Sequence, residues 1–439
     1  ALLLLATTSA CGRGGGANGR DAPASAVPFI PVDPAHATET DRSIADAQAR
    51  LQRDPNNSRA LLDLTQSFLQ KAREVADPSL YTKAAGILAL VARANPRDPD
   101  VLATRGTLAN AQHRFAAALA LGRRAVRESP ERTAGYAVLV DASNELGLYD
   151  DALAATQRMA DLRPDLPALS RISYARELRG DVHGAVTAMT QAVTAGRALP
   201  GENTAYVQSL LGDLLLSRGE VADAEVMYEA ALQTFPGLAA ARAGTAKVLV
   251  AQGRPAQAAA VLEEVVRVVP LAEYAGAEGD DWAAAGQPAK AAEAYALVGV
   301  IARLYAANGV NVDLELALFA ADHSPGPGLV ARARRGFRAR PGYLGHEVVA
   351  WSLYATGHPA QAAREIRAAL RLGDRDPQLR FHAAVIFDSV GDRGGAVESL
   401  DILLAGNPRF SALHAGQVAA LAARYGRPMP PPAPAGERP

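Results

Sequence analysis

The chain has 439 residues, of which 96 are alanine and only 5% are aromatic, and its formal net charge is −1. Alanine favours helices and lets them approach closely, whereas so few aromatic side chains argue against one large globular core. The near-zero charge excludes bulk attraction to nucleic acid or anionic lipid, and the single cysteine, Cys11, excludes an intrachain disulfide framework and a multi-cysteine metal site.

Residues 1–11 form an apolar run that ends in small residues, a pattern typical of a secretory signal. Ser9 and Ala10, directly before Cys11, resemble a bacterial lipobox, although Thr8 departs from the leucine usual at its first position. This resemblance implies lipidation of Cys11, a membrane anchor, and a location in the cell envelope on the periplasmic or extracytoplasmic side. The alternatives are an ordinary signal peptide with an incidental cysteine, or a stray apolar terminus.

Three further regions follow this N-terminal segment. Residues 12–40 are rich in Gly, Ala, Pro and Asp and predict a flexible tether that reaches about 30 Å. Residues 41–426 have helical periodicity throughout, and no stretch approaches the ~20 apolar residues that a membrane span requires. Residues 427–439 form a proline-rich tail that we expect to be disordered.

Two independent sequence patterns recur along the helical region. Pro96, Pro130 and Pro164 are spaced by 34 residues, and so are Pro236 and Pro270. Seven glycines are each followed by alanine five residues later, as expected where glycine ends one helix in a left-handed cap and alanine lets the next helix pass closely. These glycines are at 147, 180, 219, 253, 286, 357 and 391, and His113 takes the glycine's place before Ala118.

The chain therefore resembles the tetratricopeptide repeat family, most clearly between Ala205 and Ala272. The resemblance implies an all-α fold, a right-handed superhelical α-solenoid of about ten helix-turn-helix repeats. We expect the repeats to start near 58, 99, 133, 167, 205, 239, 272, 309, 344 and 377. A half-unit helix at 43–54 precedes them, and a capping helix at about 411–425 follows. The 41-residue interval from Pro55 to Pro96 predicts a seven-residue insertion in the loop near Asp77.

The sequence contains no recognisable catalytic or metal-binding motif. The eight histidines form no zinc-type spacing, and the nucleophile elbow and phosphate loop are both absent. We therefore predict a protein that is not an enzyme and that has no cofactor or metal.

In this family the first helix of each repeat lines a concave groove. Carried over residue by residue, the resemblance places six polar side chains on that inner wall: Asp141, Asn144, Glu177, Asp213, Asp280 and Asp388. An acidic groove would favour a partner segment that carries Lys or Arg. The alternative interpretation is that these are solvated helix faces.

A second candidate surface lies nearer the C-terminus. Trp351 and Tyr354 are one helical turn apart, and Phe381 and His382 take inward positions in the next repeat. Four ring side chains in an aromatic-poor chain predict an anchor pocket for a partner. The alternative is ordinary packing within the repeats.

Together these features predict a membrane-tethered, non-enzymatic scaffold that binds a peptide or helix of another protein in its groove. One alternative is an assembly factor of a cell-envelope machine, such as a pilus, secretion or polysaccharide-export system. Another is a cytoplasmic adaptor, if the N-terminal run is not a signal. We expect no nucleic-acid partner.

Overall fold

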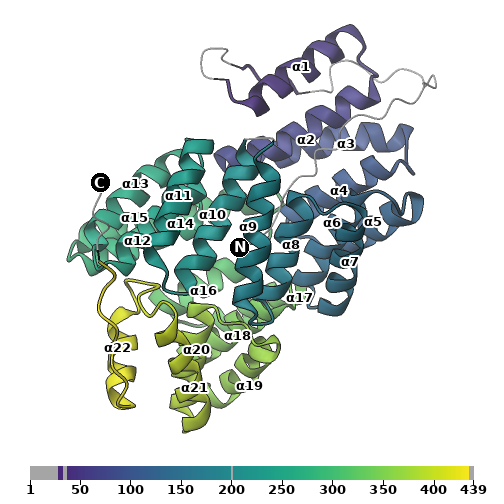
Figure 1. Ribbon diagram of the computed structural model, residues 1–439. Coiled ribbons are helices and arrows are strands. Elements are labelled where there is room, and N and C mark those ends of the chain that lie inside the picture. Colours follow the sequence, from purple (N-terminus) through teal and green to yellow (C-terminus); the bar gives the residue numbers. More distant parts are fainter. Residues whose placement is uncertain (1–27, 33–36, 199–200, 435–439) are drawn as a thin grey trace. The chain divides into compact units, whose positions relative to one another are not determined.

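The computed structural model describes residues 28–32, 37–198 and 201–434, and these form 22 α-helices, one short 3₁₀ helix and no strand (Figure 1). Cys11 and the rest of the expected lipobox lie outside the described residues. Within those residues, no helix combines the length and the hydropathy that crossing a bilayer would require.

The chain divides into two compact units, which are described separately. Unit 1 covers residues 1–168 and 304–311, and unit 2 covers 169–303 and 312–439. Unit 1 contains α1 (Glu39–Arg53), α2 (Ser58–Val75), α3 (Ser79–Ala94), α4 (Pro99–Ala111), α5 (Phe115–Glu128), α6 (Thr133–Glu145) and α7 (Tyr149–Leu162).

Unit 2 contains most of α8 (Leu166–Glu177) and of α15 (Pro288–Ala307), the two helices that cross the division. The other helices of unit 2 are α9 (Val182–Gly196), α10 (Glu202–Ser217), α11 (Val221–Thr234), α12 (Ala239–Ala251), α13 (Pro255–Val268), α14 (Ala272–Ala284), α16 (Asp313–His323), α17 (Leu329–Ala339), α18 (Tyr343–Ala355), α19 (Pro359–Ala369), η2 (Leu370–Leu372), α20 (Pro377–Ser389), α21 (Arg393–Ala405) and α22 (Ala415–Arg424).

The helices from α2 to α21 form ten consecutive helix-turn-helix pairs, which confirms the predicted all-α repeat fold. The first helix of each pair begins within four residues of its predicted start. First helices also pack against first helices of neighbouring pairs, as α2 does on α4 in unit 1 and α18 on α20 in unit 2. The first helices that pack together in this way within each unit are called the inner layer, which is the layer expected to carry the inward-facing residues.

In seven of the ten pairs, the turn between the two helices has the predicted glycine in a left-handed cap. All seven marked glycines have positive φ, between 71° and 80°, and His113 adopts the same conformation with φ of 56°. The alanines five residues after them are at most 3% exposed, because the second helix crosses the first at these side chains. Glycine is favoured at such a turn because it has no Cβ to clash in the left-handed region.

The position of the first insertion differs from the prediction. The loop between α2 and α3 is no longer than the loop between α4 and α5. Instead α2 has 18 residues against 13 in α4, and α3 has 16 against 14 in α5. The seven extra residues therefore extend both helices, and the left-handed residue Ala76 ends α2.

The described ends of the repeat array also carry ordered structure. Helix α1 starts at Glu39, inside the stretch expected to be a tether, because Thr38 and Asp41 form a capping box. At the other end α22 covers α20 and α21 through Leu421, which packs on Ala384 and Leu400.

The start of the proline-rich tail differs from the expected disorder where the structure describes it. Met429 packs on the core around Trp351, the Ala433 amide donates to the Ala251 carbonyl at 3.3 Å, and Pro432 lies beside Gly253. Proline cannot extend α22, but its preset φ lets the chain run extended along the surface of unit 2.

Candidate functional site

Two of the predicted inner acids are held by tyrosines of their own repeat. The Tyr228 hydroxyl donates to Asp213 at 2.9 Å, and the Tyr295 hydroxyl donates to Asp280 at 2.9 Å. In both pairs the tyrosine follows the aspartate by 15 residues, so the contact repeats from one helix pair to another. These carboxylates therefore orient the buried Tyr228 and the half-buried Tyr295 as well as facing the inner layer.

Both acids also contact the following first helices. Lys247 of α12 reaches Asp213 at 2.7 Å, and His323 Nε2 of α16 lies 3.3 Å from Asp280. Burial is the main reason that the pKa of Asp280 rises to about 7. Asp213 and Asp280 are thus parts of internal contacts, not simply solvated charges.

The remaining predicted polar residues have different surroundings. Asp388 on α20 accepts bonds from Arg424 and the Tyr425 hydroxyl, both at 2.7 Å, so it fastens the capping helix. In unit 1, Asp141 is half-buried on α6, and Asn144 is only 9% exposed. An amide this deeply buried offers little surface to a partner.

Glu177, at the end of α8, lies in a crowded acidic environment. Burial, and then the repulsion of Asp374, raise the pKa of Glu177 to about 8, and Asp376 and Asp213 add to this repulsion. The turn after α8 packs directly on the loop before α20, since a Cβ on Gly180 would stand 2.5 Å from the Gly373 carbonyl oxygen.

Glu177, Asp374 and Asp376 are called the acidic cluster below. Asp374 is 4% exposed, and burial raises its pKa to about 7, whereas Asp376 is exposed and caps α20 by accepting from the Leu379 amide at 2.9 Å. Lys247, already paired with Asp213, is a cation that faces this group. Sequence reasoning missed Asp374 and Asp376, although the Asp374-Arg-Asp-Pro377 run that ends just inside α20 is a typical helix-start signal.

The expected anchor pocket is mostly core. Phe381 and His382 are both 0% exposed and Trp351 is 5% exposed, so Phe381 and His382 are not surfaces that a partner contacts. Trp351 stacks on Tyr354 with ring centroids 5.0 Å apart and on His382 at 4.1 Å. These rings are buried because successive first helices press their inner faces together, which is the packing alternative raised above.

A pocket of about 540 Å³ nevertheless opens beside this ring cluster. Trp351, Tyr354 and Asp388, all predicted from the sequence, line it together with Asp322, His414 and Arg424. The pocket is therefore bounded by α16, α18, α20, α22 and the segment that leads into α22, all within unit 2.

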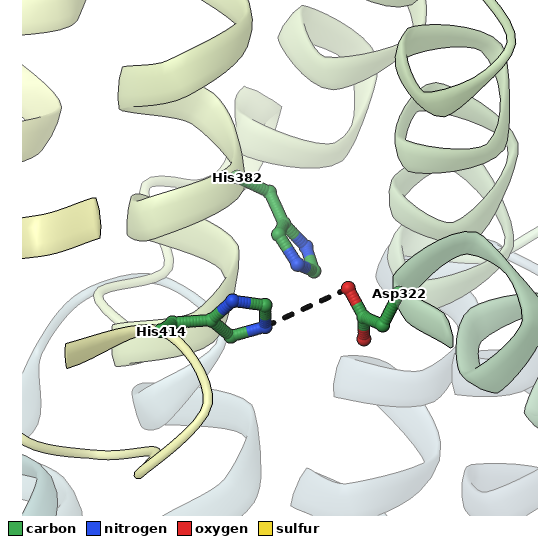
Figure 2. A group of neighbouring side chains, drawn as sticks. All are labelled: Asp322, His382 and His414. Atoms are coloured by element: carbon green, nitrogen blue, oxygen red, sulfur yellow. Dashed lines mark ion pairs between the residues drawn. The ribbon is translucent and has the colours of Figure 1, made fainter. Parts of the chain in front are cut away.

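At the inner end of this region three polar side chains converge, as Figure 2 shows. Asp322 of α16, His382 of α20 and His414, just before α22, place one donor atom each within 4.8 Å of one another. Burial lowers the pKa of His382 to about 4 and that of His414 to about 3, so both imidazoles are neutral at pH 7. No sequence motif marks this group, because its members lie in separate helical pairs.

Comparisons with known proteins agree with the helix pairing. Two family models, both described as tetratricopeptide repeat, match residues 215–279 and 350–409. No curated protein matches the sequence.

Several solved structures are similar to part of the chain. A thermophilic repeat protein from Thermus thermophilus is 23% identical, with a TM-score of 0.37, over 42% of this chain and 99% of its own. A repeat protein from Parabacteroides merdae is 17% identical, with a TM-score of 0.39, over 56% and 98%. The protein pilF of Pseudomonas aeruginosa is 16% identical, with a TM-score of 0.36, over 50% and 94%.

Proposed function

We propose that this chain, two segments of which match tetratricopeptide repeat models, is a protein-interaction scaffold that binds a cationic segment of a partner protein on the inner helix layer of unit 2. The observation that carries this proposal is the acidic cluster. Glu177 and Asp374 are brought together by packing, and their pKa values are raised by burial and by neighbouring negative charge. A Lys or Arg side chain placed among them would relieve that repulsion.

The surroundings of the cluster favour a segment of a protein over a small ligand. Besides Glu177, the first helices of unit 2 carry Asp213, which is paired with Lys247 and Tyr228, and Asp280, which is bonded to Tyr295. Tyr343, at the start of α18, is half-buried beside Asp374 and Asp376. Extended or helical segments suit such a surface, because their side chains repeat at regular spacing.

The test uses a short fluorescent peptide of alternating Lys and Ala, with an alternating Glu and Ala peptide as the matched negative probe. We expect the full chain to bind only the cationic peptide, and to bind it more weakly as salt increases. Glu177→Gln and Asp374→Asn should each lower the affinity roughly 3–10-fold. Glu229→Gln, which removes the same charge from an exposed position on α11, is the control and should leave the affinity unchanged.

The pH dependence supplies a second readout. Because the pKa of Glu177 is about 8 and that of Asp374 about 7, both carboxyls ionise between about pH 6 and pH 9. Binding of the cationic peptide should therefore strengthen over that range, and the increase should shrink in Glu177→Gln. Equal binding of both peptides, or equal affinity of all variants, would refute the proposal.

We also propose that the scaffold is anchored at the cell envelope through a lipid on Cys11. What supports this is the Ser9-Ala10-Cys11 sequence directly after an apolar run. The test is the mass of the mature N-terminus, after expression of the natural full-length gene and separation of membranes. A diacylated Cys11 in the membrane fraction is the expected result, and unmodified Cys11 in the soluble fraction is the result that would refute it.

A further inference from the structure

The convergence of Asp322, His382 and His414 has a geometry that hydrogen bonding within the protein does not account for. His414 Nε2 lies 3.6 Å from Asp322 Oδ1, which is longer than a hydrogen bond. His382 is 0% exposed, and its Nε2 has no hydrogen-bond partner among the described residues. In Figure 2 the His382 ring points toward the Asp322 carboxylate and the His414 ring.

The other side of His382 is held by a carboxyl group and by a stacked ring, and Nε2 is an electron-pair donor when Nδ1 carries the proton. Its Nδ1 lies 2.9 Å from Oε1 of Glu347, a residue 2% exposed, and the Trp351 ring stacks on the imidazole at 4.1 Å. A neutral imidazole that donates from Nδ1 to a carboxylate must present a lone pair at Nε2. This arrangement of carboxylate, histidine and open Nε2 is the one that orients histidine ligands in metal sites.

The Asp322 carboxylate is oriented too. Trp351 Nε1 donates to its Oδ1 at 2.7 Å, so the same indole holds the aspartate by a hydrogen bond and His382 by stacking. His414 is packed on the Phe381 ring, with centroids 4.5 Å apart, and its Nδ1 is buried without a partner in the described part of the chain. Three donors are therefore positioned by one aromatic core.

From this geometry we propose that Asp322, His382 and His414 bind a divalent transition-metal ion, and that Zn²⁺ is the ion their donor set fits best. Two imidazoles and one carboxylate suit Zn²⁺ and its neighbours, whereas Mg²⁺ and Ca²⁺ require oxygen ligands. Ligand bonds of about 2.0–2.1 Å bring tetrahedral donors to roughly 3.3 Å from each other, so binding draws the three groups together by about 1.5 Å at most.

The adjacent pocket provides access and an open coordination position. Asp322 and His414 line it, whereas His382 is 0% exposed. Three protein ligands with a fourth position facing a pocket of about 540 Å³ leave room for water or for a donor atom of a ligand. The bound ion would also tie α16, α20 and the α22 segment together.

The test is a titration of the untagged, EDTA-stripped full chain with ZnCl₂ and, separately, with CoCl₂. We expect one high-affinity ion per chain, a rise in the melting temperature, and a Co²⁺ visible spectrum of low-symmetry nitrogen and oxygen coordination. Trp351 supplies an intrinsic reporter, because it touches both Asp322 and His382. In a Trp282→Phe background, its fluorescence should change in step with binding.

Variants separate this site from adventitious binding. Asp322→Asn and His414→Gln should lower Zn²⁺ affinity at least roughly 100-fold, and Glu347→Gln, which acts through His382, about 10–100-fold. His346→Gln is the matched control, because His346 pairs with Glu365 outside the group, and it should leave affinity unchanged. Each variant is checked for native helicity, and Asp322→Asn, which keeps the shape of the side chain, serves if a histidine variant fails to fold.

Two outcomes would contradict the proposed metal site. Failure of the stripped wild-type chain to bind one equivalent of Zn²⁺ would overturn the proposal. So would binding that Asp322→Asn and His414→Gln leave intact, because the ion would then occupy other histidines.

Discussion

At the scale of single residues, the stacking of repeats depends on large rings inserted between glycines. The Tyr228 ring is 0% exposed and lies between Gly212 of its own repeat and Gly244 of the next. A Cβ on Gly244 would stand 2.2 Å from Tyr228 Cε1, closer than real contacts allow. Gly279 meets Tyr295 in the same way at 2.2 Å, so this is a recurring means of bringing helices close.

The Gly244→Ala substitution should therefore lower the free energy of unfolding by about 2–3 kcal/mol, even though alanine is the better helix former. Chemical denaturation measures the effect. Gly86→Ala on α3, where a Cβ would meet nothing within 4 Å, is the control and should raise stability by about 0.5–1 kcal/mol. A neutral Gly244→Ala would mean that the Tyr228 ring moves aside freely.

At two of the helix-capping glycines, the cost of backbone strain can be measured separately from the cost of a steric clash. Gly180 and Gly286 have φ of 72° and 73°, but a Cβ at Gly286 enters open space, whereas at Gly180 it meets the Gly373 carbonyl oxygen. Gly286→Ala should cost about 1 kcal/mol from backbone strain alone.

Gly180→Ala should cost about 1–2 kcal/mol more than that, because the loop before α20 must also shift. Thermal unfolding of the two variants gives the comparison. Equal losses would contradict the close contact between these two loops of unit 2.

At the scale of secondary-structure elements, the first helices carry two kinds of inner-face residue. Those of α10 and α14 place an aspartate under a tyrosine of the second helix, which fixes that helix. The end of α8 and the start of α20 instead bring carboxylates together. The same layer thus holds the repeats in place and carries the acidic cluster.

The cap of the array is a second element with a defined role. Helix α22 covers apolar side chains of α20 and α21, and Arg424 and Tyr425 both bind Asp388. Asp388→Ala removes both bonds at once, and we expect a loss of about 1–2 kcal/mol.

Hydrogen exchange should show the Asp388→Ala loss as faster opening of α22 than of α18. Tyr425→Phe, which removes only one of the two bonds, should have an intermediate effect. Unchanged exchange in α22 would show that apolar packing alone holds the cap.

At the scale of the whole molecule, buried and half-buried carboxyls with raised pKa values link stability to pH. Glu177 and Asp281 have pKa values of about 8, and those of Asp280, Glu347 and Asp374 are about 7, in each case chiefly because of burial. A raised carboxyl pKa means that the folded chain holds more protons than the unfolded chain between about pH 4.5 and 8. The free energy of unfolding must then fall as pH rises through that window.

The two buried histidines act in the opposite sense but in a lower window. Because the pKa values of His382 and His414 are lowered to about 4 and about 3, the unfolded chain takes up their protons below about pH 6.5 and stability falls there. Above that pH, only the carboxyls with raised pKa values still change the free energy of unfolding.

We expect the free energy of unfolding in EDTA to fall by roughly 2–5 kcal/mol between about pH 6.5 and 8.5. Glu177→Gln should flatten part of this decline and be about 1–2 kcal/mol more stable than wild type near pH ~9. Denaturant titrations across this range give the profile. A flat or rising curve would contradict the raised pKa values.

The amino-acid sequence by itself determined the repeat fold, because the turn and the crossing of each helix pair depend on residues close in the chain. Gly219 and Ala224 specify their turn and crossing within five positions, and Gly253 and Ala258 do the same. The positions of Asp213, Asp280 and Asp388 on first helices followed from the same period.

Only the tertiary structure decided which side chains meet and which stay exposed. The sequence predicted Phe381 and His382 as contact residues, yet the packing of α18 on α20 buries both. Asp374 joins Glu177, and His414 joins Asp322, across nearly 200 and about 90 residues of chain. A local period carries no information about such distant pairs, because their distances depend on small rotations summed over every helix pair between them.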